Sequence, residues 1–159
     1  MNDIHLIDLQ EQPVAGVRQR VRMEDLKDLF DTAFEKVLDG IRSAGAAPAG
    51  APYARYFGRP EETVEVEIGF PVQEPFDATG DLVVSTLPAA RAAEVIHAGP
   101  YDTLPDTYRA MERWIEEHQL QMLEESWEIY EAGPESDPDP ATWRTRILFP
   151  VSGPQVKPA

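Results

Sequence analysis

The chain contains no cysteine among its 159 residues, which excludes disulfide bonds, thiol catalysis and cysteine-based zinc sites. It also lacks any run approaching the roughly 18 apolar residues of a membrane-spanning helix. Residues 1–5 carry neither a basic segment nor an apolar run, so no signal peptide is predicted. We therefore expect a soluble, cytoplasmic protein without a membrane partner.

Basic residues are scarce: 14 lysines and arginines stand against 29 acidic residues, giving a net charge of −15. A surface of this sign argues against direct nucleic-acid binding, because phosphates need basic partners. It permits a cationic small molecule or a basic protein as partner, but a well-solvated acidic surface is the simpler explanation of the charge. The sequence also has no metal-ligand spacing, phosphate-binding glycine loop or nucleophilic serine elbow. We therefore predict no metal site and no cofactor.

The length suits a single domain, which we place at residues 1–152, followed by a frayed tail at 153–159. Two segments have the apolar spacing of amphipathic helices, 23–44 and 103–118. In the second helix, Pro105 lies in the first turn and Thr103 is the predicted N-cap. Alternation and β-branched content predict strands at 4–9, 14–21, 52–57, 63–70, 82–87, 88–98, 126–133 and 143–149.

The two halves of the chain share a pattern of strand, helix, strand and strand. Three pairs of identical residues lie 75 positions apart: Pro13 and Pro88, Leu29 and Leu104, and Gly58 and Gly133. The similar segments that close the two halves, 68–72 and 147–151, lie 79 positions apart. The difference of four falls in the acidic turn at 135–140. We infer an internal duplication, with repeat one at 3–75 and repeat two at 79–151.

Duplicated β-α-β-β units predict an α+β fold. Their strands would form one curved, mainly antiparallel eight-stranded sheet, with both helices on one face. The seam between the two units would then form a ligand cleft.

The strand at 126–133 carries the leading site candidate. Side chains alternate across a strand, so Trp127 and Ile129 share one face while Glu128 and Tyr130 share the other. If that second face is covered, Glu128 is a buried acid with a functional role; if it is open to water, Glu128 is an ordinary surface residue. At the constant spacing of 75, Tyr53 matches Glu128 and Arg55 matches Tyr130, which would direct both pairs towards a common centre.

Several further segments form a recognisable set: HAGPYD at 97–102, WEIY at 127–130, TRILFPV at 145–151, APYARY at 51–56 and GFPV at 69–72, together with Tyr108, Trp114 and Ile115. In their order and spacing, they resemble the GyrI-like small-molecule-binding family, the effector-binding domain of some AraC-type and MerR-type regulators. The resemblance covers roughly residues 3–151. One departure is the segment 118–121, which stands where many relatives carry a glycine turn.

The resemblance implies a pocket at a pseudo-two-fold seam and a pocket glutamate that maps to Glu128. Aromatic side chains stack on flat ligands in such pockets, and the matching candidates here are Tyr53, Tyr130 and either Trp114 or Trp143; Arg55 lies beside them. From the residues alone, the pattern favours a core position for Trp114, because it shares helical spacing with Met111 and Ile115.

Three functions follow as expectations. The leading one is a stand-alone binding protein for apolar or cationic aromatic compounds, including drugs or toxins. The second is a hydrolase of cyclopropane-bearing electrophilic toxins, in which Glu128 donates a proton while Tyr130 or Tyr53 positions water. The third is an acidic inhibitor of DNA gyrase; a separate transcription regulator is an alternative protein partner.

Three further residues, His97, Glu65 and Glu67, each allow a structural and a functional interpretation. His97 either acts as a base or makes a structural hydrogen bond at the turn that follows it. Glu65 and Glu67 are expected on a solvated strand face, with added negative potential at the pocket mouth as the alternative.

Overall fold

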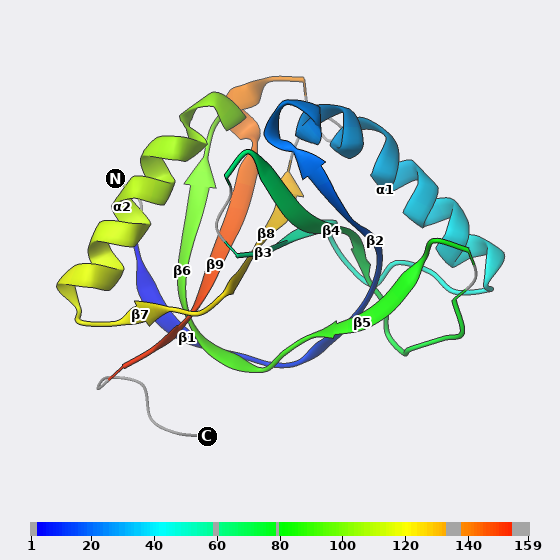
Figure 1. Ribbon diagram of the computed structural model, residues 1–159, viewed down its shortest axis with the longest axis horizontal. Helices are drawn as coiled ribbons and strands as arrows, with labels where there is room; N and C mark the ends of the chain where they lie inside the picture. The colour runs from blue at the N-terminus through cyan, green and yellow to red at the C-terminus, as the bar shows by residue number, and fades with distance from the viewer. Residues whose placement is uncertain (1–2, 59–60, 79, 133–137, 154–159) are drawn as a thin grey trace. The chain divides into compact units, whose positions relative to one another are not determined.

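The computed structural model describes residues 3–58, 61–78, 80–132 and 138–153 (Figure 1). The chain divides into two compact units. The continuous unit consists of Gln10–Ala89, and the split unit combines the residues up to Leu9 with those from Ala90 onward. Gly133, residues 135–137 of the predicted acidic turn and the predicted tail from residue 154 lie outside the described residues.

The continuous unit is an antiparallel sheet with a helix on one face. Its strands follow the order β3-β4-β2-β5. Ala33, Val37 and Ile41 form the buried stripe of the helix. The elements are β2 (Gln12–Arg22), η1 (Met23–Asp25), α1 (Leu26–Ser43), β3 (Tyr53–Phe57), β4 (Thr63–Pro71) and β5 (Val83–Leu87).

The split unit repeats this plan. Its strands follow the order β1-β6-β9-β8, and β7 pairs with β9. Met111 and Ile115 of α2 pack with Val95, Ile147 and Phe149 in a buried core. The elements are β1 (His5–Leu9), β6 (Ala90–Ala98), η2 (Tyr101–Thr103), α2 (Leu104–Glu117), β7 (Gln121–Met122), β8 (Glu125–Ala132), η3 (Pro140–Thr142) and β9 (Arg144–Ser152).

These elements confirm the α+β class, the two helices and the antiparallel strands. The helices are shorter than predicted, because each begins with a 3-10 turn. Pro88 lies outside the strands, and the short β7 was not predicted. Thr103 stands at the N-cap of α2 without capping it; its hydroxyl donates to the carbonyl oxygen of Pro100 instead, at 2.9 Å. In the described part of the chain, no helix is both long and apolar enough to cross a membrane.

The leading strands are exchanged between the two β-α-β-β segments. β1 precedes β2 in the chain but pairs with β6, and β5 precedes β6 but pairs with β2. The compact units therefore differ from the repeats at 3–75 and 79–151 in where these two strands belong. The repeat boundaries and the ligand cleft at the seam stay predictions.

The strand registers correct the predicted match between Tyr53 and Glu128. Ala54 of β3 lies opposite Ile68, whereas Glu128 of β8 lies opposite Ile147. Since Ile68 and Ile147 begin the two matching segments at 68–72 and 147–151, Glu128 corresponds to Ala54.

It follows that Tyr53 corresponds to Trp127 and Arg55 to Ile129. A slip of one residue moves a side chain to the other face of a sheet. Tyr53 and Glu128 therefore occupy opposite faces of their respective sheets.

Candidate functional site

Glu128 is the buried acid that the sequence pointed to, with 4% of its surface exposed. The Tyr130 hydroxyl donates to one carboxylate oxygen, Oε1, at 2.5 Å. The Tyr108 hydroxyl donates to the other oxygen, Oε2. Two phenol groups thus hold a single buried carboxylate, which offsets part of the cost of removing its charge from water.

Strand pairing explains why this carboxylate is covered. Glu128 lies opposite Ile147, and Ile147 belongs to the core that packs against α2. Glu128 and Tyr130 therefore share the helix-covered face of the split unit, as alternation along β8 requires. Tyr108 reaches Glu128 from α2, and its ring also contacts that of Phe149 at 5.6 Å between centroids.

Aromatic rings continue from Tyr130. Tyr101 meets Tyr130 edge to face at 6.3 Å between centroids, and Trp143 lies 5.0 Å from Tyr101. The carbonyl oxygen of Trp143 accepts a hydrogen bond from the Gly99 backbone at 2.9 Å, which ties the start of β9 to the turn after β6. Among the predicted ligand-binding residues, the structure brings Glu128, Tyr130 and Trp143 into one neighbourhood, with Tyr101 joining the last two.

A buried carboxylate among aromatic rings attracts cations for two reasons. Its charge is only partly screened at this depth, and the negative faces of nearby aromatic rings favour a positive group. The arrangement also suits flat apolar groups, which stack on such rings.

The other predicted site residues lie elsewhere. Trp114 projects from another side of α2, where its ring stacks on His118 with centroids 3.9 Å apart. It also packs against the buried core of the split unit while remaining partly exposed, and a ligand-binding role for it stays a prediction. Tyr53 and Arg55 belong to the continuous unit, and their place beside Glu128 stays a prediction.

Sequence reasoning missed Tyr108 as a site residue and misplaced Glu67. Tyr108 follows the inward-facing spacing of the helix at 103–118, but it was named only among the residues of the family resemblance. Glu67 was expected on a solvated face, but it is 1% exposed. Its oxygen Oε2 accepts hydrogen bonds from the hydroxyls of Tyr53 at 2.5 Å and Ser85 at 3.0 Å. The charged pattern of β4 concealed this burial, because a strand with a polar face ordinarily presents it to water.

Arg55 lies beside this second acid cluster on β3. Its guanidinium donates to the carbonyl oxygen of Thr86 at 3.3 Å and lies over the Phe57 ring, 4.9 Å from its centroid. Glu65, at the edge of the same face, pairs with Arg18 and Arg20. The hydrogen bond from Arg18 is the main cause of the lowered pKa of Glu65.

Tyr53 should stay protonated in alkaline solution. Burial above all, and then the neighbouring Glu67, raise its pKa far above the ordinary value of 10.0. The unfolded chain releases this proton near pH ~10 while the folded chain retains it, so the contribution of Tyr53 to stability is intact below that pH and declines above it. In a titration followed by tyrosinate absorbance at 295 nm, Tyr53 should ionise only as the protein unfolds.

A Tyr53→Phe variant is the matched control for this titration. Its stability should fall less steeply above pH ~10 than that of the native chain. If all five tyrosines ionise together in the folded protein, the environment assigned to Tyr53 is wrong.

His97 makes structural contacts. Its Nδ1 lies 2.6 Å from the Thr107 hydroxyl, and its Nε2 lies 2.9 Å from the Pro100 carbonyl oxygen and 3.0 Å from the Thr103 hydroxyl. These bonds fasten the turn between β6 and α2. Within the described ranges, no three histidine or acidic side chains gather in a way that would hold a metal ion.

A model of the GyrI-like small molecule binding domain matches residues 2–152 of this chain. No curated protein matches the sequence significantly. Among solved structures, the C-terminal domain of EcmrR is 24% identical with a TM-score of 0.81, and the match covers 96% of this chain and 98% of that domain. In the structure of EcmrR with DNA, the TM-score is 0.83 at 24% identity, and the match covers 95% of this chain but only 57% of that one. The present chain thus spans little more than half of that protein's length.

Two further structures have the same fold at lower identity. SAV2435, in a structure bound to tetraphenylphosphonium, is 13% identical with a TM-score of 0.69; the match covers 95% of this chain and 94% of SAV2435. A hydrolase encoded by lin2189 from Listeria innocua is 12% identical with a TM-score of 0.61, covering 94% and 91%. At these identities, the likeness establishes the fold.

Proposed function

Because the chain belongs to the GyrI-like small-molecule-binding domain family, we propose that it binds an apolar or cationic aromatic compound at Glu128. The observation that carries the proposal is the buried carboxylate of Glu128, held by Tyr108 and Tyr130 beside further aromatic rings. SAV2435, which shares the fold, has a solved structure in which it is bound to tetraphenylphosphonium, a hydrophobic aromatic cation. That chemistry matches what the Glu128 neighbourhood offers.

The hydrogen bonds of Glu128 favour binding through charge. The hydroxyls of Tyr108 and Tyr130 lie against its two oxygens, and an ionised carboxylate can accept a hydrogen bond from each of them. A ligand cation near Glu128 would meet this negative charge, and the rings of Tyr130 and Tyr101 would supply flat surfaces for its aromatic groups. Tyr108 comes from α2, so a small displacement of that helix would uncover Oε2 for the ligand.

Two ions of the same shape and opposite charge test this proposal. Tetraphenylphosphonium and tetraphenylborate both carry four phenyl rings around a single charge. In calorimetric titrations, the phosphonium ion should bind at least ~10-fold more tightly, a difference of about 1.4 kcal/mol. Equal affinity for both ions, or tighter binding of the borate, would exclude a role for the carboxylate charge.

Hydrolysis of an electrophilic small molecule is a second candidate. The favouring observation is the Tyr130 hydroxyl, 2.5 Å from Glu128, since an acid and a phenol at this distance could protonate a strained ring and orient the attacking water. A structural neighbour is named a hydrolase. Incubation with a cyclopropane-bearing electrophile should then yield ring-opened product, with less product from Glu128→Gln. Stoichiometric binding without product would remove this candidate.

A further inference from the structure

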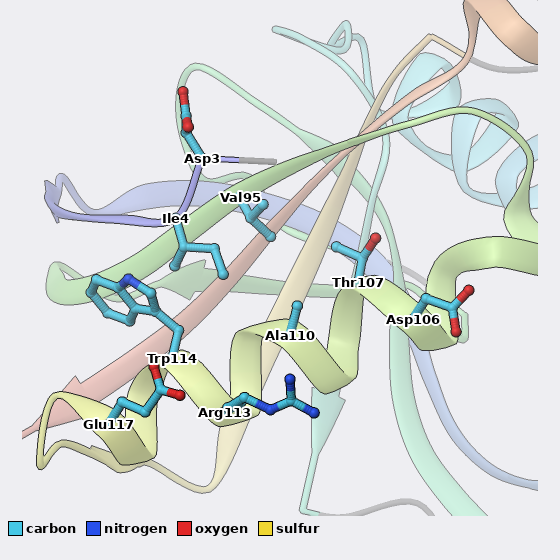
Figure 2. A pocket seen from close by; sticks show the side chains of 9 residues that line it. All are labelled: Asp3, Ile4, Val95, Asp106, Thr107, Ala110, Arg113, Trp114 and Glu117. Atoms are coloured by element: carbon cyan, nitrogen blue, oxygen red, sulfur yellow. The ribbon is translucent and has the colours of Figure 1, made fainter. Parts of the chain in front are cut away.

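A separate pocket of about 460 Å³ lies on the flank of α2 in the split unit. Figure 2 shows Ala110, Arg113 and Trp114 on the α2 side, with Val95 and Ile4 from the neighbouring strand β6 and the segment leading into β1. Neither Glu128 nor the two tyrosines that hold it belong to the lining. This α2-flank pocket is therefore a different place from the Glu128 site, and its volume is in the range of small-molecule pockets.

The wall of the pocket combines an aromatic face with aliphatic groups. Trp114 is half-buried and stacks on His118 with an interplanar angle of 22°, so one partner already supports its ring. Ile4, Val95 and Ala110 add apolar surface. A tryptophan face is the strongest cation–π acceptor among side chains.

The charges around the pocket are mainly negative. Three carboxylates line it against one guanidinium: Asp3, Asp106 and Glu117 against Arg113. Asp106 is already paired with Arg109. Asp3 and Glu117 are not ion-paired to any described residue, so their charges remain available to a ligand. The lining as a whole carries two more negative than positive charges, which favours a cation over an anion.

We propose that the α2-flank pocket is a second ligand site, which takes a small aromatic monocation of the aryl- or benzylammonium class. The aromatic group lies against Trp114 and the aliphatic wall, and the ammonium group lies towards Glu117 and Asp3. This proposal does not rest on the proposed function at Glu128, because the pocket lining includes neither Glu128 nor Tyr108 nor Tyr130.

Nuclear magnetic resonance on the 17.8 kDa chain distinguishes the two sites directly. The probe is benzyltrimethylammonium, with uncharged benzyl alcohol for comparison. The reporter is the indole N–H resonance of Trp114, assigned by its loss in Trp114→Phe. We expect a saturable shift of this resonance in both the native chain and Glu128→Gln, and at least a ~3-fold weaker response to benzyl alcohol.

Two α2 variants and one matched control test the pocket. Ala110→Leu adds a larger side chain to the pocket at an exposed helical position and should abolish the saturable shift. Glu117→Gln should weaken binding by about two- to fivefold, whereas Glu116→Gln, its exposed neighbour outside the lining, should leave it unchanged. Both positions tolerate these changes, since leucine and glutamine are good helix formers.

The second site would be overturned by the absence of a saturable Trp114 shift, or by a shift that survives Ala110→Leu. It would also be overturned if the shift disappeared in Glu128→Gln, because the probe would then occupy one site only. A Trp114 shift alongside a failed tetraphenylphosphonium experiment would support the second site and refute the proposed function. Tighter binding of tetraphenylphosphonium than of tetraphenylborate, without a saturable Trp114 shift, would support the proposed function and refute the second site.

Discussion

Replacing Glu128 with glutamine should weaken tetraphenylphosphonium binding by about 10- to 150-fold. The change keeps the shape of the side chain and an oxygen that can accept from a phenol, but it removes the buried charge. Hydrogen bonds to charged groups contribute about 1.5–3 kcal/mol, and we expect the loss of the carboxylate charge to cost a similar amount of binding free energy. The measurement is a calorimetric titration of both proteins, with thermal unfolding to show that the variant is folded.

Glu131→Gln is the matched control on the same strand. Glu131 is exposed on β8, so its replacement changes the net charge equally without touching the buried cluster. The affinity of the Glu131→Gln variant for the phosphonium ion should stay within about twofold of the affinity of the native chain, as expected for the loss of a surface charge. Equal losses in the two variants would mean that overall negative charge, and not Glu128, attracts the ligand.

Replacing Gly69 with alanine should destabilise the continuous unit by about 3 kcal/mol or more. An added Cβ would lie 2.0 Å from the Ala15 carbonyl oxygen and 2.6 Å from the Gly16 Cα. These are backbone atoms of the neighbouring strand β2, so the clash cannot be relieved by turning a side chain. Urea unfolding of the variant would measure the loss as a lower midpoint.

Gly40→Ala is the control for this substitution. Gly40 lies within α1, and its nearest neighbour to an added Cβ is the Leu82 side chain at 3.3 Å. Alanine favours a helix interior over glycine by about 1 kcal/mol, so this variant should be as stable as the native chain or slightly more so. If Gly69→Ala unfolds at the same urea concentration as Gly40→Ala, the close approach of β2 and β4 is not as described.

The close approach of β2 and β4 at Gly69 leaves room for the cluster around Glu67, the buried acid of the continuous unit. Gly16 lies opposite Gly69, and a Cβ on Gly16 would meet the Tyr53 hydroxyl at 2.9 Å. Two glycines on adjacent strands thus leave the space in which Tyr53 reaches Glu67. The corresponding positions in the split unit hold Glu94 and Leu148, which face each other in the register of β6 and β9.

Local patterns predicted the environment of Glu128 well. Its face along β8 follows from alternation, which depends only on nearest neighbours, and the β-branched and aromatic content identified the strand itself. The contact between Tyr108 and Glu128 could not be predicted from these patterns, because it depends on how α2 packs across the sheet. The helix period showed that Tyr108 faces inward without showing which strand residue it meets.

The match between Tyr53 and Glu128 was wrong because a constant spacing was assumed. α1 has 18 residues and α2 has 14, so the offset between the halves changes across the helices. Only hydrogen-bonded pairing fixes the register of a strand, and an error of one position reverses its faces. Glu67 was misjudged for a related reason: a charged residue on an alternating strand is ordinarily solvated unless tertiary packing covers it.

The exchanged leading strands have a consequence for the order of events on the ribosome. All of the continuous unit, from β2 to β5, is synthesised before β6 appears. It can therefore fold while the rest of the nascent chain is still being made. β1 is made before the continuous unit, yet its partner β6 begins only at Ala90, so β1 stays without this partner until the whole continuous unit has been synthesised. Chain elongation would thus complete the half with Glu67 before the half with Glu128.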